Sequence, residues 1–206
     1  MNRTAILTSG TTYHIYNRAN GSERLFLSAE NYRYFLKKYE EYVAQLADTF
    51  CYCLMPNHFH FLIRIKPETE LLQNLQGLSN LEGLREEGLR ETYLSRKILN
   101  QFSNFFNAYS KAFNKQHNRK GSLFMHPFKR KKINNEKYLR QLVHYIHVNL
   151  VEGGLCEKAG NWLHSSYTDI LKGNPGFLKS EEVLSWFGDK ENFIYFHSQQ
   201  TKHIEV

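Results

Sequence analysis

The alternation of apolar and polar residues along the chain predicts four β-strands. Residues 11–18 alternate and are rich in aromatic and β-branched side chains, which favour an extended chain. Residues 48–55 and 58–66 show a similar texture, and the two residues between them predict an antiparallel hairpin. The fourth strand is expected at residues 122–133, which carry the basic run KRKK.

Apolar residues spaced three and four positions apart predict three helices between and after these strands. The first spans about residues 28–46, with Ser28 as its expected N-cap. The second carries an aromatic stripe over about residues 92–113. The third covers residues 135–152 and ends before a pair of glycines, which commonly terminate helices.

The predicted order of elements, β-α-β-β-α-β-α, is that of an α+β protein with a ferredoxin-like antiparallel sheet covered by helices. The last helix follows the fourth strand. We expect one domain over residues 1–206, with its core at about 11–167. Residues 67–90 combine scattered leucines, glycines and acids and are predicted to be a mobile insertion, and residues 168–206 a C-terminal tail.

Charge and composition narrow the class of partner. The net charge of +7 and the pI near 9.2 favour a polyanionic partner, although a basic surface without a nucleic-acid partner stays open. Three cysteines do not make a disulfide framework and fit a reducing compartment. The N-terminus lacks the apolar core of a signal peptide, and no stretch approaches a membrane-spanning length. We therefore expect a cytoplasmic protein with no membrane partner.

The predicted third strand contains two histidines, His58 and His60, that raise the question of a metal site. Residues two apart in a strand share a face, so the two imidazoles are neighbours about 7 Å apart. Neutral imidazole is a common metal ligand, and the pair has chelating geometry. The opposite face of the same strand is expected to enter the core through Phe59, Phe61, Ile63 and Ile65.

Several interpretations of this pair remain open. Two ordinary strand histidines are the simplest. A histidine-triad nucleotide hydrolase is disfavoured because Leu62 stands where its third histidine would be. A zinc site could recruit Cys51 and Cys53 from the paired strand, since thiolates suit zinc.

The last helix offers another completion of the site. Tyr145 and Asn149 are four residues apart, so they lie one above the other on the flank of the helix's apolar stripe. A tyrosine hydroxyl beside a divalent cation held by His58 and His60 would be a nucleophile for a phosphodiester. Asn149 could add an oxygen ligand from the same helix. The alternative for Tyr145 is ordinary packing.

Five sequence motifs occur in the following order within residues 11–167: YHIYNRANGSERLF, CYCLMPNHFHFLIRI, NRKGSLFMHPFKRKKI, YLRQLVHYIHVNLVEGGL and NWLHSSY. Together they resemble the IS200-like tyrosine transposases of the HUH superfamily of single-strand DNA endonucleases. In appearance the chain is closest to the REP-associated tyrosine transposases. It departs from their pattern at Leu150, where they have proline, and in its WLHSSY segment.

The resemblance implies a set of metal ligands, a nucleophile and a DNA substrate for the chain. His58 and His60 would hold Mg²⁺ or Mn²⁺ with Asn149 as third ligand, and Tyr145 would attack a phosphate to leave a 5′-phosphotyrosine and a free 3′ hydroxyl. The substrate would be single-stranded DNA flanking a hairpin, bound by a monomer or a homodimer. A domesticated DNA-binding protein on the same fold, without transposition, is the alternative, and a phosphodiesterase for small nucleotides is a third class.

The expected DNA contacts are basic and aromatic side chains. Phosphate groups are expected to meet a set of lysines and arginines near the fourth strand, namely Arg119, Lys120, Lys129, Arg130, Lys131 and Lys132. Tyr13, Tyr16 and Phe128 are the aromatic residues considered for stacking on unpaired bases, with core packing as the alternative for each.

Overall fold

The computed structural model describes residues 5–74 and 87–199 of the 206-residue chain. It contains one four-stranded sheet of order β2-β3-β1-β4, in which every neighbouring pair is antiparallel. The strands are β1 (Thr12–Arg18), β2 (Ala47–Met55), β3 (His58–Ile65) and β4 (Lys129–Ile133). This is the strand order of a split βαβ sandwich, so the predicted α+β, ferredoxin-like fold is confirmed.

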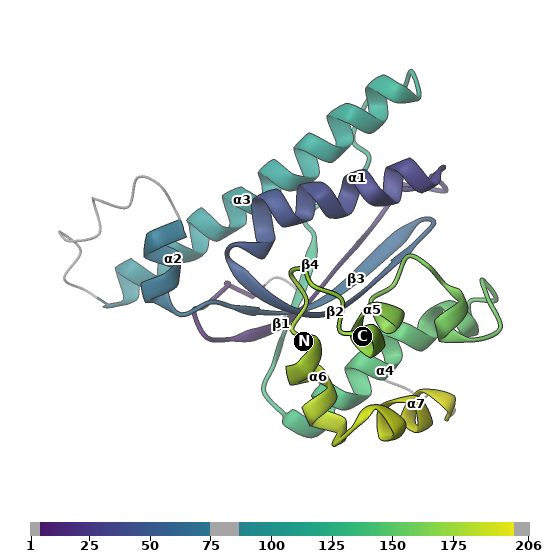
Figure 1. Ribbon diagram of the computed structural model, residues 1–206. Helices are drawn as coiled ribbons and strands as arrows, with labels where there is room; N and C mark the ends of the chain where they lie inside the picture. Colours follow the sequence, from purple (N-terminus) through teal and green to yellow (C-terminus); the bar gives the residue numbers. More distant parts are fainter. Residues whose placement is uncertain (1–4, 75–86, 200–206) are drawn as a thin grey trace.

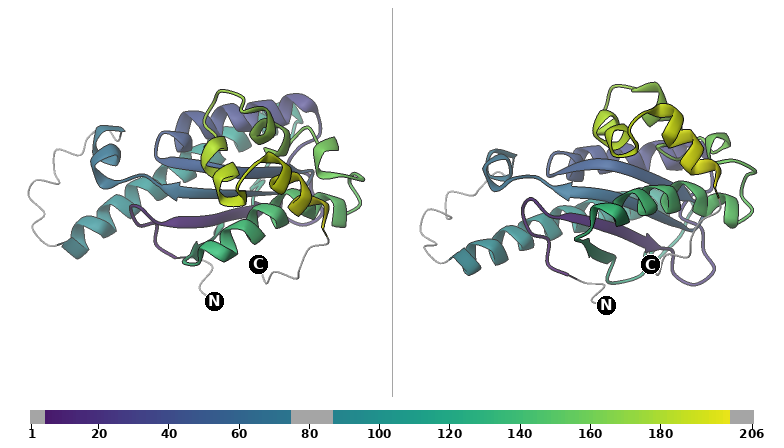
Figure 2. Two further views of the ribbon diagram at one scale, coloured as in Figure 1. Left: turned by 60° about the horizontal axis from the view of Figure 1, so that its bottom comes forward. Right: turned by 90° about the horizontal axis from the view of Figure 1, so that it is seen from below.

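Helices cover both faces of the sheet, as Figures 1 and 2 show. On one face lie α1 (Ala29–Tyr39), which continues as a π-helical turn over Glu40–Ala44, and the long α3 (Glu87–Gln116). On the other lie α4 (Glu136–Glu152) and three short helices, α5 (Tyr167–Lys172), α6 (Ser180–Phe187) and α7 (Lys190–Ser198). The sheet is therefore the middle layer of three.

Alternation along the strands sends side chains into two separate cores. Phe59, Phe61, Ile63 and Ile65 of β3 pack with α1 and α3 as predicted, beside aromatic residues such as Phe35 and Phe105. Leu62 points the other way and packs with α4. The expectation that only the face carrying Phe59 and Phe61 enters a core was wrong, because His60 on the second face is only 4% exposed.

Strand β2 belongs to both cores because its register shifts between Thr49 and Cys51. Thr49 meets the hydroxyl of Tyr39 on α1 at 2.7 Å, whereas Phe50 and Cys51 both contribute to the core under α4. A β-bulge places one extra residue in a strand and so breaks the strict alternation. Thr49 and Cys51, although two residues apart, therefore face opposite sides of the sheet.

The fourth strand is shorter than predicted. Regular pairing is confined to Lys129–Ile133. The preceding segment forms an isolated bridge between Phe124 and Ala19, just after β1, and Met125 accepts from the Asn17 side chain and donates to the Arg18 carbonyl. Pro127, whose bond to His126 is cis, has no backbone N–H to donate to a strand partner. The proline separates the loop after α3 from the strand.

The region predicted as a C-terminal tail folds onto the sheet. Val183, Phe187 and Phe193 of α6 and α7 are buried in the core under α4. Helices of six to nine residues have little stability alone and depend on such packing, and segments this short have too few turns for periodicity to identify them. Of the predicted insertion at 67–90, α2 occupies Glu68–Asn74, and residues 75–86 lie outside the described residues.

Candidate active site

The candidate site lies where β1 and β3 run side by side under α4. Register pairs Arg18 with His58 and Tyr16 with His60, and places His14 opposite Leu62. Partners in an antiparallel ladder share a face. The even-numbered residues of β1 and β3 therefore form one surface, which faces α4.

His60 is the central side chain of this surface. Its Nδ1 lies 2.8 Å from His14 Nε2, and its Nε2 lies 3.4 Å from the Asn149 side-chain amide. The rings of His14 and Tyr16 stack against it at centroid distances of 5.0 and 5.6 Å. Burial, reinforced by His14 and His58, holds the pKa of His60 well below its ordinary value, so the imidazole is neutral.

The hydrogen bond between His14 and His60 couples the tautomers of the two rings. In the tautomer in which His60 Nδ1 donates to His14 Nε2, a lone pair is left on His60 Nε2, directed at Asn149. His14 is fully buried, and burial, with Lys131 nearby, lowers its pKa to about 3. A buried partner that orients a ligating histidine is a recurrent feature of metal sites.

His58 is half-buried at the start of β3, directly after the turn. Its Nδ1 lies 2.6 Å from Asn57 Oδ1, an acceptor, so Nδ1 carries the proton and Nε2 keeps its lone pair. Burial and the positive charge of Arg18 lower the pKa of His58 to about 4. The His58 and His60 rings lie 5.3 Å apart, both neutral at physiological pH.

Tyr145 and Asn149 approach this pair from α4, as their spacing predicts. The Tyr145 ring meets His60 and His14 edge-on, at centroid distances of 5.8 and 6.5 Å. Burial raises the pKa of Tyr145, and the acidic side chain of Glu152 adds to the shift. The phenol is therefore protonated at neutral pH, and its reaction as a nucleophile needs a polarised substrate.

The donor set fits a divalent cation if an amide oxygen is counted. Within residues 5–74 and 87–199, no group of three or more His, Cys, Asp or Glu side chains could hold a metal ion. His58 and His60 supply two nitrogens, and Asn149 supplies an oxygen once its amide is turned so that Oδ1 faces His60. The two orientations of an amide differ only in assignment. Two nitrogens and one oxygen leave room for water and phosphate.

The cysteines do not complete a zinc site. Cys53 stands opposite His60 in the register, but it and Cys51 are fully buried. Burial raises the pKa of both thiols above their ordinary value, which disfavours the thiolate that zinc requires. They pack as small apolar residues between β2 and α4.

Tyr138, seven residues before Tyr145 on α4, has different neighbours. Lys131 Nζ donates to its hydroxyl at 3.3 Å and lies 5.3 Å from its ring centroid. Tyr138 therefore contacts the basic edge strand, whereas Tyr145 contacts the histidines.

The basic run of β4 is divided between the two faces of the sheet. Lys129 and Lys131 stand opposite Tyr16 and His14 on the face of the candidate site. Arg130 and Lys132 alternate to the other face, where Arg130 donates to the Ala5 carbonyl and lies over the Phe128 ring.

The two remaining basic residues of the predicted set follow α3. Lys120 is exposed, but Arg119 holds its own loop together. It forms an ion pair with Glu23 and donates to the Gly121 and Ser122 carbonyls. Its guanidinium is committed to the fold, so the sequence-based assignment of Arg119 to phosphate is not supported by its contacts.

The predicted stacking aromatics also separate. Tyr13 is fully buried, with its hydroxyl donating to the Ile6 carbonyl, so core packing, the alternative considered for it, is its role. Phe128 packs on Phe102 of α3. Tyr16 stays beside His60. The residue that sequence reasoning missed is His14, because its contact with His60 depends on strand register rather than on spacing.

The geometry defines a class: a split βαβ sandwich with a histidine pair on its central strand and a tyrosine-bearing helix across it. No protein-family model and no curated protein sequence matches the chain. Among solved structures, the chain is similar to a REP-associated tyrosine transposase bound to a REP hairpin, with a TM-score of 0.51 and 18% identity over 86% of this chain and 88% of that one. The resemblance read from the motifs is thus confirmed at the level of the fold.

Proposed function

We propose that the protein is a metal-dependent, single-stranded DNA transposase and endonuclease that acts through a 5′-phosphotyrosine at hairpin-bearing sites. The observation that carries the proposal is the convergence of Tyr145 and Asn149 on His60 from a separate helix. The fold shared with a transposase bound to a DNA hairpin supports a DNA partner. Mg²⁺ or Mn²⁺ is the proposed cofactor.

Each residue has one task in this mechanism. Tyr145 Oη attacks the phosphorus, the bond from phosphorus to the 3′ oxygen breaks, the phenol loses its proton and the departing oxygen gains one. His58, His60 and Asn149 would hold the cation, which supplies charge neutralisation at a non-bridging phosphate oxygen. When His14 Nε2 accepts from His60 Nδ1, a lone pair stays on His60 Nε2. The phosphotyrosine retains the bond energy, so the 3′ hydroxyl can rejoin strands.

The DNA contacts proposed are those on the site face of the molecule. Lys129 and Lys131 stand beside the histidines in register and are proposed to neutralise backbone phosphates near the reacting bond. Lys120 is exposed at the end of the loop after α3 and is proposed as a further contact. No helix within the described ranges is both long and apolar enough to cross a membrane.

The decisive experiment is trapping of the covalent adduct. Incubation with hairpin-bearing oligonucleotides and Mn²⁺ should give an SDS-stable adduct, which mass spectrometry should place on Tyr145. Tyr145→Phe removes one oxygen and should abolish the adduct while DNA binding persists. Tyr138→Phe is the matched control and should keep most activity. An adduct on another residue would contradict the mechanism, and hairpin binding without any adduct would identify a DNA-binding protein that does not cleave.

A further inference from the structure

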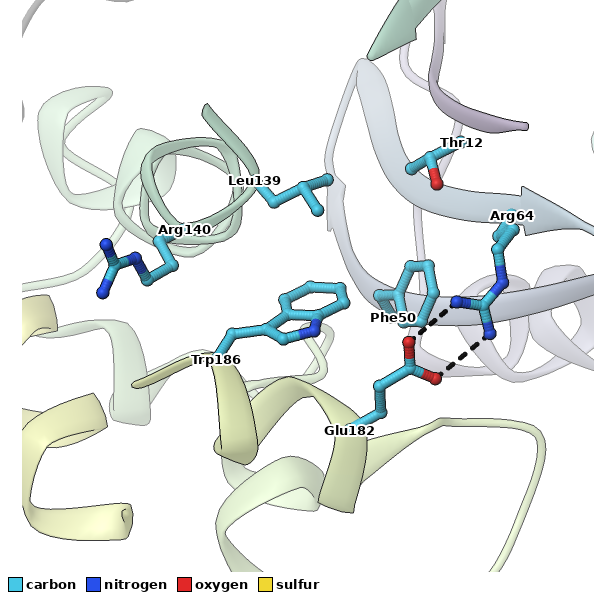
Figure 3. A pocket seen from close by; sticks show the side chains of 7 residues that line it. All are labelled: Thr12, Phe50, Arg64, Leu139, Arg140, Glu182 and Trp186. Atoms are coloured by element: carbon cyan, nitrogen blue, oxygen red, sulfur yellow. Dashed lines mark hydrogen bonds and ion pairs between the residues drawn. The ribbon is translucent and has the colours of Figure 1, made fainter. Parts of the chain in front are cut away.

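A cavity lies on the same face of the sheet as the candidate active site, toward the other end of the strands. It has a volume of about 600 Å³ and is formed where α4 and α6 stand apart over β2 and β3 (Figure 3). The side chains that shape it are Phe50, Arg64, Leu139, Arg140, Glu182 and Trp186. The volume is large enough for one nucleotide.

One wall of this cavity is aromatic. Trp186 is half-buried, and its ring lies 4.7 Å from that of Phe50 at an angle of 58°. Figure 3 shows the indole reaching across the cavity below Leu139, toward Phe50 and Glu182. A partly accessible indole at the side of a cavity offers a stacking surface for an unpaired base.

The opposite wall is a fixed polar network. Both terminal nitrogens of Arg64 donate to Glu182, at 2.8 and 3.1 Å, and one also donates to Asp48 at 2.9 Å. The ring of Phe50 lies 5.0 Å from the guanidinium carbon. Each carboxylate oxygen of Glu182 has a second lone pair, so the group can accept further N–H donors while it stays paired with Arg64. Guanine presents two adjacent N–H groups and matches such an acceptor best.

The cavity lies within a few nucleotides of Tyr145. Arg64 is four residues from His60 along β3, about 13 Å at 3.3 Å per residue. Arg140 is five residues from Tyr145 along α4, about 7.5 Å. These lengths correspond to about two to four stacked nucleotides. Lys131, opposite His14 in the register, lies on the path between the two sites.

We propose that this cavity binds one unpaired base of the DNA substrate, about two to four nucleotides from the phosphodiester that Tyr145 attacks. The base stacks on Trp186 and donates to Glu182, and exposed Arg140 faces the adjoining phosphate. Guanine is the base that binds best. The inference rests on the proposed function and adds to it a determinant of substrate sequence, with α6 as the element that supplies it.

The test uses two probes: twelve-residue oligothymidylate and the same strand with one central guanine. Wild-type protein should bind the guanine probe about tenfold more tightly, in line with a good base contact. Glu182→Gln should bring the two affinities within twofold, because Asp48 still holds Arg64 in that variant. Equal affinities in the wild type, or an unchanged preference in Glu182→Gln, would overturn the proposal.

Tryptophan fluorescence gives a second readout that does not depend on Glu182. The chain has two tryptophans, Trp162 and Trp186, and stacking of guanine should quench the second. Trp186→Phe should lose the quench, whereas Tyr195→Phe, at an exposed aromatic of α7, should keep it. A quench that survives Trp186→Phe overturns the assignment, even if Glu182→Gln fails to fold.

The adduct assay on the same preparations separates this proposal from the proposed function. A Tyr145 adduct without any guanine preference overturns the base pocket alone. A guanine preference that depends on Glu182, without an adduct, supports the pocket and overturns strand cleavage.

Discussion

The two faces of the sheet bury different kinds of side chain. The face under α1 and α3 is closed by stacked and tilted aromatic rings, for example Phe35, Phe61 and Phe105. The face under α4 buries polar groups among its apolar residues, including His14 and His60. Because β1 and β3 contribute to both, adjacent residues of one strand serve different purposes. One face is packed with aromatic rings, and the other buries the imidazoles of the candidate site.

Buried imidazoles extend beyond the candidate site into the C-terminal helices. His147 of α4 lies 3.0 Å from His197 of α7 and 2.8 Å from the hydroxyl of Ser166. His197 Nδ1 faces the Phe193 carbonyl at 2.7 Å, so it donates there, and its Nε2 accepts from His147. These hydrogen bonds hold α7 against α4. Ser166 Oγ also accepts from the Tyr52 backbone N–H.

Phe61 and His60 are adjacent on β3 but are buried on opposite faces of the sheet, so their substitution should affect stability differently. Phe61→Ala opens a cavity in the aromatic core and should lower the free energy of unfolding by about 3–5 kcal/mol. His60→Ala leaves His14 unpaired and should cost about 1–3 kcal/mol. Denaturant unfolding measures both variants.

The variant with the smaller loss of stability, His60→Ala, should show the larger loss of metal affinity. His60→Ala should lose Mn²⁺ binding in calorimetry, as should His58→Ala, whereas folded Phe61→Ala should keep it. If His58→Ala bound Mn²⁺ as the wild type does, the cation site would have to lie elsewhere.

Acid is expected to destabilise the folded protein through the buried His147 and His197. Burial lowers the pKa of His197 to about 3, and burial with His197 and His144 nearby holds the pKa of His147 well below its ordinary value. The unfolded chain therefore binds protons first as the pH falls below about 6.5, and the folded protein loses stability between there and pH 3. Each such histidine contributes up to about 1.4 kcal/mol per pH unit.

Substitution at His197 isolates one contribution to this slope. His197→Gln should be less stable than the wild type at pH 7, because His147 loses its partner. Between pH 6 and 4 its unfolding free energy should fall less steeply, by up to about 1.4 kcal/mol per pH unit. Denaturation curves at several pH values give both slopes, and parallel slopes would show that His197 is not neutral in the folded protein.

Sequence alone predicted most of the sheet but only part of the site. Alternation located β1, β2 and β3, and helical spacing placed Tyr145 and Asn149 on one flank of α4, where the structure brings them to His60. The contact of His14 with His60 needed the strand register, which alternation does not determine. The C-terminal helices escaped because packing rather than periodicity stabilises them. That both the histidine pair and Tyr145 take part in catalysis stays a prediction.

The smallest effect is expected for two neighbouring lysines of β4, which alternation directs to opposite faces of the sheet. Lys131 stands opposite His14 on the site face, and Lys132 stands opposite the buried Tyr13 on the other. If phosphates follow the site face, Lys131→Gln should lower the slope of log affinity against log salt by about 0.7 for single strands, with no change in sequence preference. Lys132→Gln, with the same loss of charge one residue away, should leave the slope unchanged. Binding of homopolymer strands over a range of salt concentrations measures both, and equal losses would mean that DNA contacts the strand from its edge rather than from the face of the histidines.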